Sequence, residues 1–151
     1  MMARPEYETQ KDLDKENNIS QVLSDVWKCS LVKMPIKYHL DYAIVKDEKI
    51  VGFCELKSPS YALADFKRFG GFFISLDKFM SAKKLNESTG LPCMIVINAT
   101  DGIWYTTFHD AKFTSFKIKG RKDRGDWQDM EPCVVLDTDQ FKLFKKSVDN
   151  V

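Results

Sequence analysis

The stretch HLDYAIVKDEKIVGFCELKSPS, residues 39–60, limits the possible folds of this chain more than any other segment. Two apolar runs lie on either side of the charged segment KDEK, a pattern typical of two paired strands joined by a turn. Asp41, Glu55 and Lys57 nevertheless fall inside the apolar runs rather than at their ends. Because burying an uncompensated carboxylate is costly, we expect these three residues to serve a function beyond the core.

The register of this hairpin decides whether the two acids meet. A three-residue turn at 47–49 would place Asp41 opposite Glu55. It would also bring His39 opposite Lys57, and all four side chains would share one face. A two-residue turn would shift the register by one and separate the acids onto opposite faces. We therefore predict a turn with an odd number of residues, in a hairpin whose two mostly apolar faces place it at the centre of the sheet.

Size and charge exclude several classes of protein. The chain has 151 residues, and we predict a single domain over residues 1–151. Its net charge of +1 excludes a uniformly basic nucleic-acid clamp but not a local basic patch. The first residues do not resemble a secretory leader and no apolar run is long enough to span a bilayer, so a soluble, cytoplasmic protein without membrane contact is expected. Cys54, Cys93 and Cys133 lie in apolar runs without metal-ligand spacing, which indicates buried thiols rather than a zinc site.

The rest of the chain predicts alternating helices and strands. The helix expected at 12–30 has an apolar face formed by Ile19, Val22, Leu23, Val26 and Trp27. After the hairpin we expect a loop or short irregular helix at 58–71, a helix at 72–88, strands at 93–100, 103–109 and 112–120, a charged loop at 120–132, a strand at 133–137 and a last helix at 140–148. The fold class is therefore α/β, with a mixed sheet flanked by helices.

Two carboxylates and a lysine on one face form a set that can bind a divalent cation. Carboxylate and carbonyl oxygens are the ligands that Mg²⁺ and Mn²⁺ prefer, and Mg²⁺ is commonly held by one or two carboxylates together with substrate phosphates. Asp41, Glu55 and the backbone carbonyl of Leu56 are the expected metal ligands. Lys57 would orient or deprotonate a water, or neutralise charge on the phosphate.

The pattern of Asp41 followed by Glu55-Leu56-Lys57 resembles the PD-(D/E)XK nuclease superfamily. The resemblance covers roughly residues 8–100. It implies a restriction-endonuclease-like α-β-β-β-α-β core, with the remainder as a C-terminal β/α extension. It also implies a Mg²⁺- or Mn²⁺-dependent endonuclease or exonuclease acting on DNA, or alternatively on RNA. One departure is Leu40, which stands where the family pattern has proline.

The resemblance suggests further site residues. The superfamily often adds a glutamate from the first helix, for which Glu16 is the best match and Asp12 the second choice. Some members place a polar or basic residue on the helix after the ExK strand, and Ser75 and Lys78 are the candidates here. The predicted nucleic-acid contacts are Lys67, Arg68, Lys78, Arg121, Lys122 and Arg124, which would bind phosphates without reading sequence.

Each assignment has a plainer alternative. The hairpin charges could form a structural salt-bridge network at a sheet edge, and Glu16 could be a solvated residue near a helix start. The basic residues could belong to ordinary solvated surfaces. The chain could also be an inactive nuclease-fold protein that binds nucleic acid or acts in assembly. Its compact format resembles phage-encoded and Holliday-junction-resolving members, which implies a phage protein acting in host cytoplasm, with a homodimer as one option.

Overall fold

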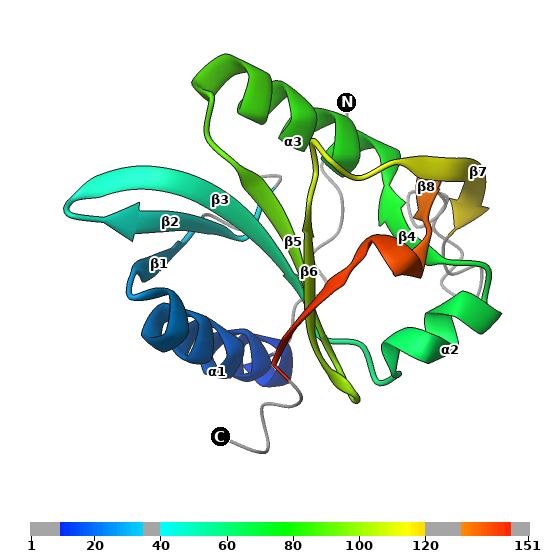
Figure 1. Cartoon of the computed structure of the whole chain (residues 1–151), viewed down its shortest axis with the longest axis horizontal. Coiled ribbons are helices and arrows are strands. Elements are labelled where there is room, and N and C mark those ends of the chain that lie inside the picture. The colour runs from blue at the N-terminus through cyan, green and yellow to red at the C-terminus, as the bar shows by residue number, and fades with distance from the viewer. Residues whose placement is uncertain (1–9, 35–39, 120–130, 146–151) are drawn as a thin grey trace.

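The structure, a computed structural model, describes residues 10–34, 40–119 and 131–145. Its elements follow one another along the chain as shown in Figure 1. They are α1 (Gln10–Trp27), β1 (Ser30–Lys33), β2 (Tyr42–Lys46), β3 (Lys49–Lys57), α2 (Leu63–Arg68), β4 (Phe72–Ser75), α3 (Leu76–Thr89), β5 (Cys93–Ala99), β6 (Gly102–Thr107), β7 (Phe113–Lys119), β8 (Glu131–Leu136), the 3-10 helix η3 (Thr138–Gln140) and β9 (Lys142–Lys145).

The central sheet has six strands in the order β1-β2-β3-β5-β6-β9, and the predicted hairpin β2-β3 lies inside it. Strands β3 and β5 are parallel and the other neighbours are antiparallel, so the sheet is mixed as predicted. A second, antiparallel sheet has the order β4-β8-β7. The order α1-β1-β2-β3-α3-β5 reproduces the expected α-β-β-β-α-β core, with α2 and β4 inserted before α3.

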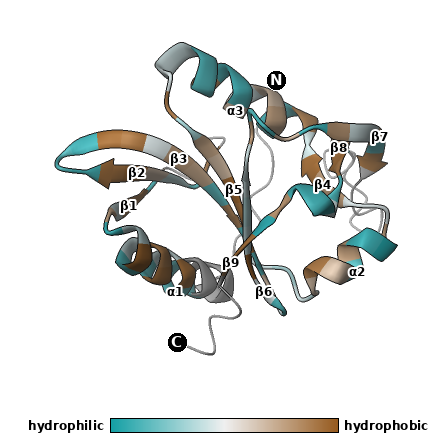
Figure 2. Ribbon diagram, viewed as in Figure 1, coloured by the Kyte–Doolittle hydropathy of each residue, from teal (hydrophilic) through white to brown (hydrophobic). Residues whose placement is uncertain are grey.

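Two apolar layers cover the faces of the central sheet, and α1 and α3 lie on opposite sides of it (Figure 1). On the α1 side, Ile19 and Leu23 pack with residues that include Cys54 and Leu56 of β3. On the other side, Phe79 of α3 packs with residues that include Phe53 of β3. Hydrophobic residues accordingly run along β3 and β5 (Figure 2). Because side chains alternate along a strand, Glu55 belongs to the α3 side.

The turn of the hairpin has two residues, so the predicted three-residue turn at 47–49 is wrong. Lys46 pairs with Lys49, and the intervening Asp47 and Glu48 have φ angles of +50° and +64°. Two consecutive residues with positive φ are the signature of the tight turn whose twist matches that of the paired strands.

A β-bulge restores the register that the shorter turn would have shifted. The pairing slips between Ile44 and Val45, and Ile44 then pairs with Gly52. Beyond the bulge Tyr42 pairs with Cys54, which is the predicted register for this end of the hairpin. An inserted residue changes the alternation of one strand by one position. The bulge therefore gives the register that the three-residue turn was predicted to give.

Residues 72–75 form strand β4, where the sequence predicted the start of a helix. Phe72 and Ile74 are buried and pair with β8, while the alternate side chains are half-buried. Helix α3 begins directly afterwards, and Ser75 Oγ accepts a hydrogen bond from the backbone N–H of Lys78 at 3.0 Å. A short apolar run before a helix cannot be assigned from periodicity alone, but the serine N-cap marks the true start.

Two further expectations for the described residues are wrong. The predicted helix at 140–148 is replaced by η3 and by β9, which pairs with the edge of β6; residues 146–148 lie outside the described residues. Val26 is exposed rather than packed on the sheet. The sequence also gave no signal for the short strand β1, whose pairing with β2 is a tertiary contact.

The expectations for four strands, for a short helix and for three cysteines are confirmed. Strands β5, β6, β7 and β8 lie where they were predicted, and α2 is the short helix expected within 58–71. Cys54, Cys93 and Cys133 are buried. In the part of the chain that the structure describes, no helix is long and apolar enough to cross a membrane.

Gly71, which precedes β4, allows the chain to lie close to β8 because it has no side chain. It has a φ angle of +133°, and an added Cβ would lie 2.7 Å from the carbonyl oxygen of Leu136 and 2.7 Å from Cγ1 of Val135. We expect Gly71→Ala to lower the free energy of unfolding by about 3 kcal/mol, through backbone strain and overpacking. Urea unfolding of the variant measures this loss.

Gly90→Ala is the control for backbone strain without overpacking. Gly90 ends α3 with a φ angle of +72°, and its added Cβ would have no neighbour within 4 Å. This variant should lose about 1 kcal/mol. If both variants lose the same free energy of unfolding, the close contact with β8 does not explain the loss at residue 71.

Candidate functional site

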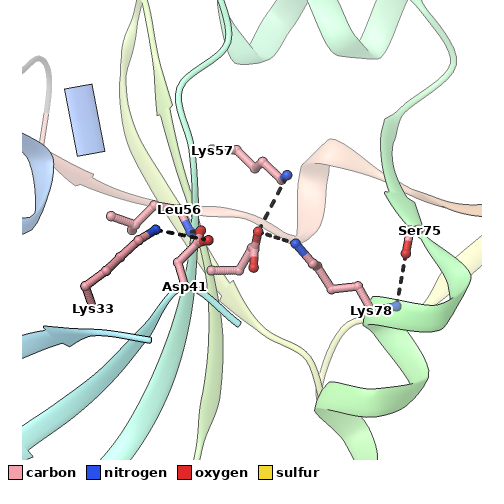
Figure 3. Close-up of polar contacts among 7 residues, drawn as sticks. Lys33, Asp41, Leu56, Lys57, Ser75 and Lys78 are labelled. Carbon is pink, nitrogen blue, oxygen red and sulfur yellow. Dashed lines mark hydrogen bonds and ion pairs between the residues drawn. The ribbon is translucent and has the colours of Figure 1, made fainter. Parts of the chain in front are cut away.

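Glu55 is a buried carboxylate at the centre of a cluster of charged side chains. Its residue is 1% exposed, on the α3 side of β3. Lys78 Nζ lies 2.5 Å from its Oε1, and Lys57 Nζ lies 3.5 Å from the same oxygen (Figure 3). The other oxygen, Oε2, is buried and has no hydrogen-bond partner among the described residues. A buried acceptor without a partner is rare and calls for an explanation.

The surroundings of Glu55 have opposite effects on the pKa of its carboxyl group. Burial raises the pKa of the Glu55 carboxyl above its ordinary value, while Lys57 and Lys78 lower it and Asp41 raises it again. The net effect is a raised pKa, because the loss of hydration outweighs the two ammonium groups. The folded chain therefore holds the ionised form of Glu55 at a cost in stability.

Asp41 lies just before β2 and is tied to β3 through the backbone. Its Oδ2 accepts a hydrogen bond from the backbone N–H of Leu56 at 2.9 Å, and its Oδ1 lies 3.8 Å from Lys33 Nζ of β1. In a strand, the N–H and C=O of one residue point to the same side. In a regular strand, the carbonyl of Leu56 would therefore point toward the same edge of β3 as this N–H; its role as a metal ligand stays a prediction.

The lysines differ in how firmly they are held. The Lys57 side chain, at the end of β3, is 44% exposed, whereas the Lys78 side chain is 23% exposed. Lys78 stands in the first turn of α3, which Ser75 caps, and so approaches Glu55 from the helix (Figure 3). Lys78 was predicted both as a nucleic-acid contact and as a residue near the site, and the structure brings it against Glu55.

The oxygens gathered here are of the type that binds hard divalent cations. The described residues contain no group of three or more His, Cys, Asp or Glu side chains that could hold a metal by themselves. Two carboxylates and a backbone carbonyl do fit Mg²⁺, which commonly takes few protein ligands and completes its shell with water and substrate phosphate. The unpartnered Oε2 of Glu55 is the observation that favours such a cation.

The remaining predicted site residues are not in this cluster or cannot be placed. Lys67 and Arg68 lie exposed on α2, where Lys67 pairs with Asp139 at 3.2 Å and Arg68 with Asp65. Helix α1 carries Glu16 and Asp12, but it packs on the face of β3 opposite Glu55, and their side chains lie outside the described residues. The residues Arg121, Lys122 and Arg124 also lie outside the described part.

Lys33 is the cluster member that sequence reasoning missed. It lies on β1, a strand without a recognisable pattern of its own, and reaches Asp41 because β1 pairs with β2. Lys33 Nζ also lies 5.2 Å from the ring centroid of Tyr42. No local signal in the sequence could have indicated this contact.

Comparison with known proteins assigns the family. A family model described as "Phage putative PDDEXK endonuclease" matches residues 2–144. The fold is similar to Hjc, a Holliday junction resolvase from Archaeoglobus fulgidus, with a TM-score of 0.52 and 8% identity over 84% of this chain and 87% of that one. It is also similar to D212, a nuclease from a fusselovirus, with a TM-score of 0.50 and 12% identity over 93% of this chain and 90% of that one.

A search of curated protein sequences gave no match. At 8% and 12% identity the two solved structures support the restriction-endonuclease-like fold alone. The family model, by contrast, spans nearly the whole sequence, including Asp41, Glu55 and Lys57. The chain therefore belongs to this phage family of PDDEXK endonucleases.

Proposed function

We propose that this chain is a metal-dependent nuclease that hydrolyses phosphodiester bonds in DNA, with Mg²⁺ or Mn²⁺ as its cofactor. The observation that supports this most is the buried Glu55 carboxylate, whose Oε2 has no hydrogen-bond partner among the described residues. Asp41 and Lys57 are close enough to act on its charge. A buried carboxylate of this kind costs stability and contributes nothing to the packing of an apolar core. A divalent cation would satisfy that oxygen and offset its cost.

The position of each residue suggests its role in the proposed reaction. Asp41, Glu55 and the Leu56 carbonyl would hold the cation, which when bound polarises a phosphate oxygen and lowers the pKa of a water. Lys57 reaches solvent at the end of β3 while its Nζ stays 3.5 Å from Glu55. Lys57 can therefore orient or deprotonate the attacking water, or neutralise charge on the phosphate.

DNA is the proposed substrate because of the family and the structural neighbours. One neighbour is named as a Holliday junction resolvase, and the other as a nuclease. The names of these neighbours motivate DNA as the substrate to test, and the shape of the DNA is a separate question for the same experiment. Branched DNA belongs in that test beside single strands and duplexes.

Wild-type protein is expected to cleave at least one member of a panel of single-stranded, duplex, flapped and four-way-junction DNA in Mn²⁺ or Mg²⁺. Glu55→Gln, Asp41→Asn and Lys57→Met should each lower the rate constant at least about a hundredfold, since each removes a group that holds the cation or acts on the reacting phosphate. Single-turnover assays on denaturing gels measure these rates.

Lys49→Ala is the matched control, because Lys49 is an exposed lysine on the same strand at the far end from the site. Its rate should stay within about twofold of wild type. Undiminished cleavage by Lys57→Met and Asp41→Asn would refute the site. Binding of DNA without any cleavage would favour the alternative that the chain is a nucleic-acid-binding or assembly module.

Metal binding should be visible without catalysis. A ligand that binds the folded state alone stabilises it by about 2.7 kcal/mol at a hundredfold excess over its dissociation constant. We therefore expect Mn²⁺ to raise the melting temperature of the wild-type protein and to leave that of Glu55→Gln unchanged. Lys49→Ala should respond like wild type. If the wild type shows no Mn²⁺-dependent change, the metal site is refuted.

In EDTA, Glu55→Gln should melt at a higher temperature than wild type. The pKa of Glu55 is raised in the folded state, so its favourable contribution is present below the ordinary glutamate pKa and is lost as pH rises through the folded value. The gain from the neutral amide should be largest at alkaline pH and small at about pH 4 or below, where the carboxyl is protonated in both states. Scanning calorimetry across pH tests this, and lower stability of Glu55→Gln at pH 8 would contradict it.

A further inference from the structure

Two lysines share a single oxygen of Glu55, and Lys78 is the closer. The Lys78 ammonium lies 2.5 Å from Oε1, at a charge-assisted hydrogen-bond distance, whereas the Lys57 ammonium lies 3.5 Å from the same oxygen. The Lys78 side chain is also the less exposed of the two, at 23% against 44%. Its interaction with Glu55 is therefore less screened by solvent.

Lys78 is directed at Glu55 by a fixed helix start. The N–H of Lys78 donates to Ser75 Oγ, which caps α3, and Ser75 itself ends β4, where it pairs with Cys133 of β8. The backbone of Lys78 is thus anchored to the second sheet. Its ammonium meets the carboxylate from across the apolar layer between the central sheet and α3.

A divalent cation on Oε2 would be a second positive charge on a carboxylate that Lys78 already compensates. Like charges at the two oxygens of one carboxylate would repel more strongly where solvent is excluded, and Glu55 is 1% exposed. The cation and the ammonium both stabilise the ionised carboxylate, so each gains less when the other is in place.

We propose that Lys78 is a positioning residue that competes with the metal for Glu55. It compensates the buried carboxylate before a cation binds and thereby lowers the affinity of the site for that cation. Lys57, which is farther away and more exposed, competes less and remains available to the phosphate. This inference rests on the proposed metal-dependent function, because it concerns the same carboxylate.

The test is a titration of EDTA-treated, desalted full-length protein with Mn²⁺ alone, by calorimetry and by melting temperature. Lys78→Met should lower the dissociation constant for Mn²⁺ about tenfold, because it removes one positive charge close to the metal site. It should also lower the melting temperature in EDTA and enlarge the rise that Mn²⁺ produces. Lys57→Met should show the same changes to a smaller extent.

Two variants separate this role from a structural one. Lys84→Met changes an exposed lysine on the same helix and should leave Mn²⁺ affinity unchanged. Lys78→Arg keeps the charge and should bind Mn²⁺ like wild type. Should Lys78→Met fail to fold, Lys78→Gln takes its place, with the same tightening expected.

Two outcomes would overturn the inference, and they are distinguishable. If wild type binds Mn²⁺ through Glu55 but Lys78→Met binds it equally or more weakly, or melts lower by the same amount in EDTA and in Mn²⁺, Lys78 is structural and the proposed function stands. If wild type shows no Mn²⁺ binding that Glu55→Gln abolishes, the metal site fails and this inference fails with it.

Discussion

The burial of the Glu55 carboxylate is the constraint that organises the structure around it. An ionised group with 1% exposure needs positive charge nearby, and the fold supplies it from two directions, by Lys57 on the same strand and by Lys78 on α3. The second direction exists because β4 and the Ser75 cap fix the start of α3. The inserted strand β4 and the second sheet therefore support the site as well as the core. The raised pKa of Glu55 shows that even this compensation is incomplete.

The site shows how far sequence patterns reach. Asp41, Glu55 and Lys57 could be singled out because charged residues interrupt apolar runs, which is a local signal. Their register was predicted correctly but for the wrong reason, since a two-residue turn and a bulge replace the three-residue turn. The extra residue of the bulge is Val51, directly before Gly52, and an isolated glycine within a strand is the local signal that could have indicated it. The turn and the bulge compensate each other, and the hydrophobic period alone resolves neither of them.

The features that could not be predicted depend on tertiary contacts. Lys33 reaches Asp41 through the pairing of β1 with β2, and β9 replaces an expected helix because the edge of β6 is available to pair. Residues 72–75 are as apolar as a buried helix turn, and only their pairing with β8 makes them a strand. Lys78 was a candidate from the resemblance, but nothing in the sequence distinguishes it as the closest cation to Glu55. Propensity is overridden wherever a partner strand supplies hydrogen bonds.

The spacing of the ExK motif itself explains why one lysine is not enough. Residues two apart on a strand share a face, but their backbones are about 6.6 Å apart and their side chains leave the sheet in parallel. Lys57 must bend back to approach Glu55, and its ammonium stops at 3.5 Å with much of the side chain in solvent. A lysine on a facing helix meets the carboxylate directly, as Lys78 does at 2.5 Å. Under the proposed function, tight compensation of the buried acid and a lysine available for the phosphate would be conflicting demands on one side chain. Two lysines, Lys78 and Lys57, would then meet one demand each.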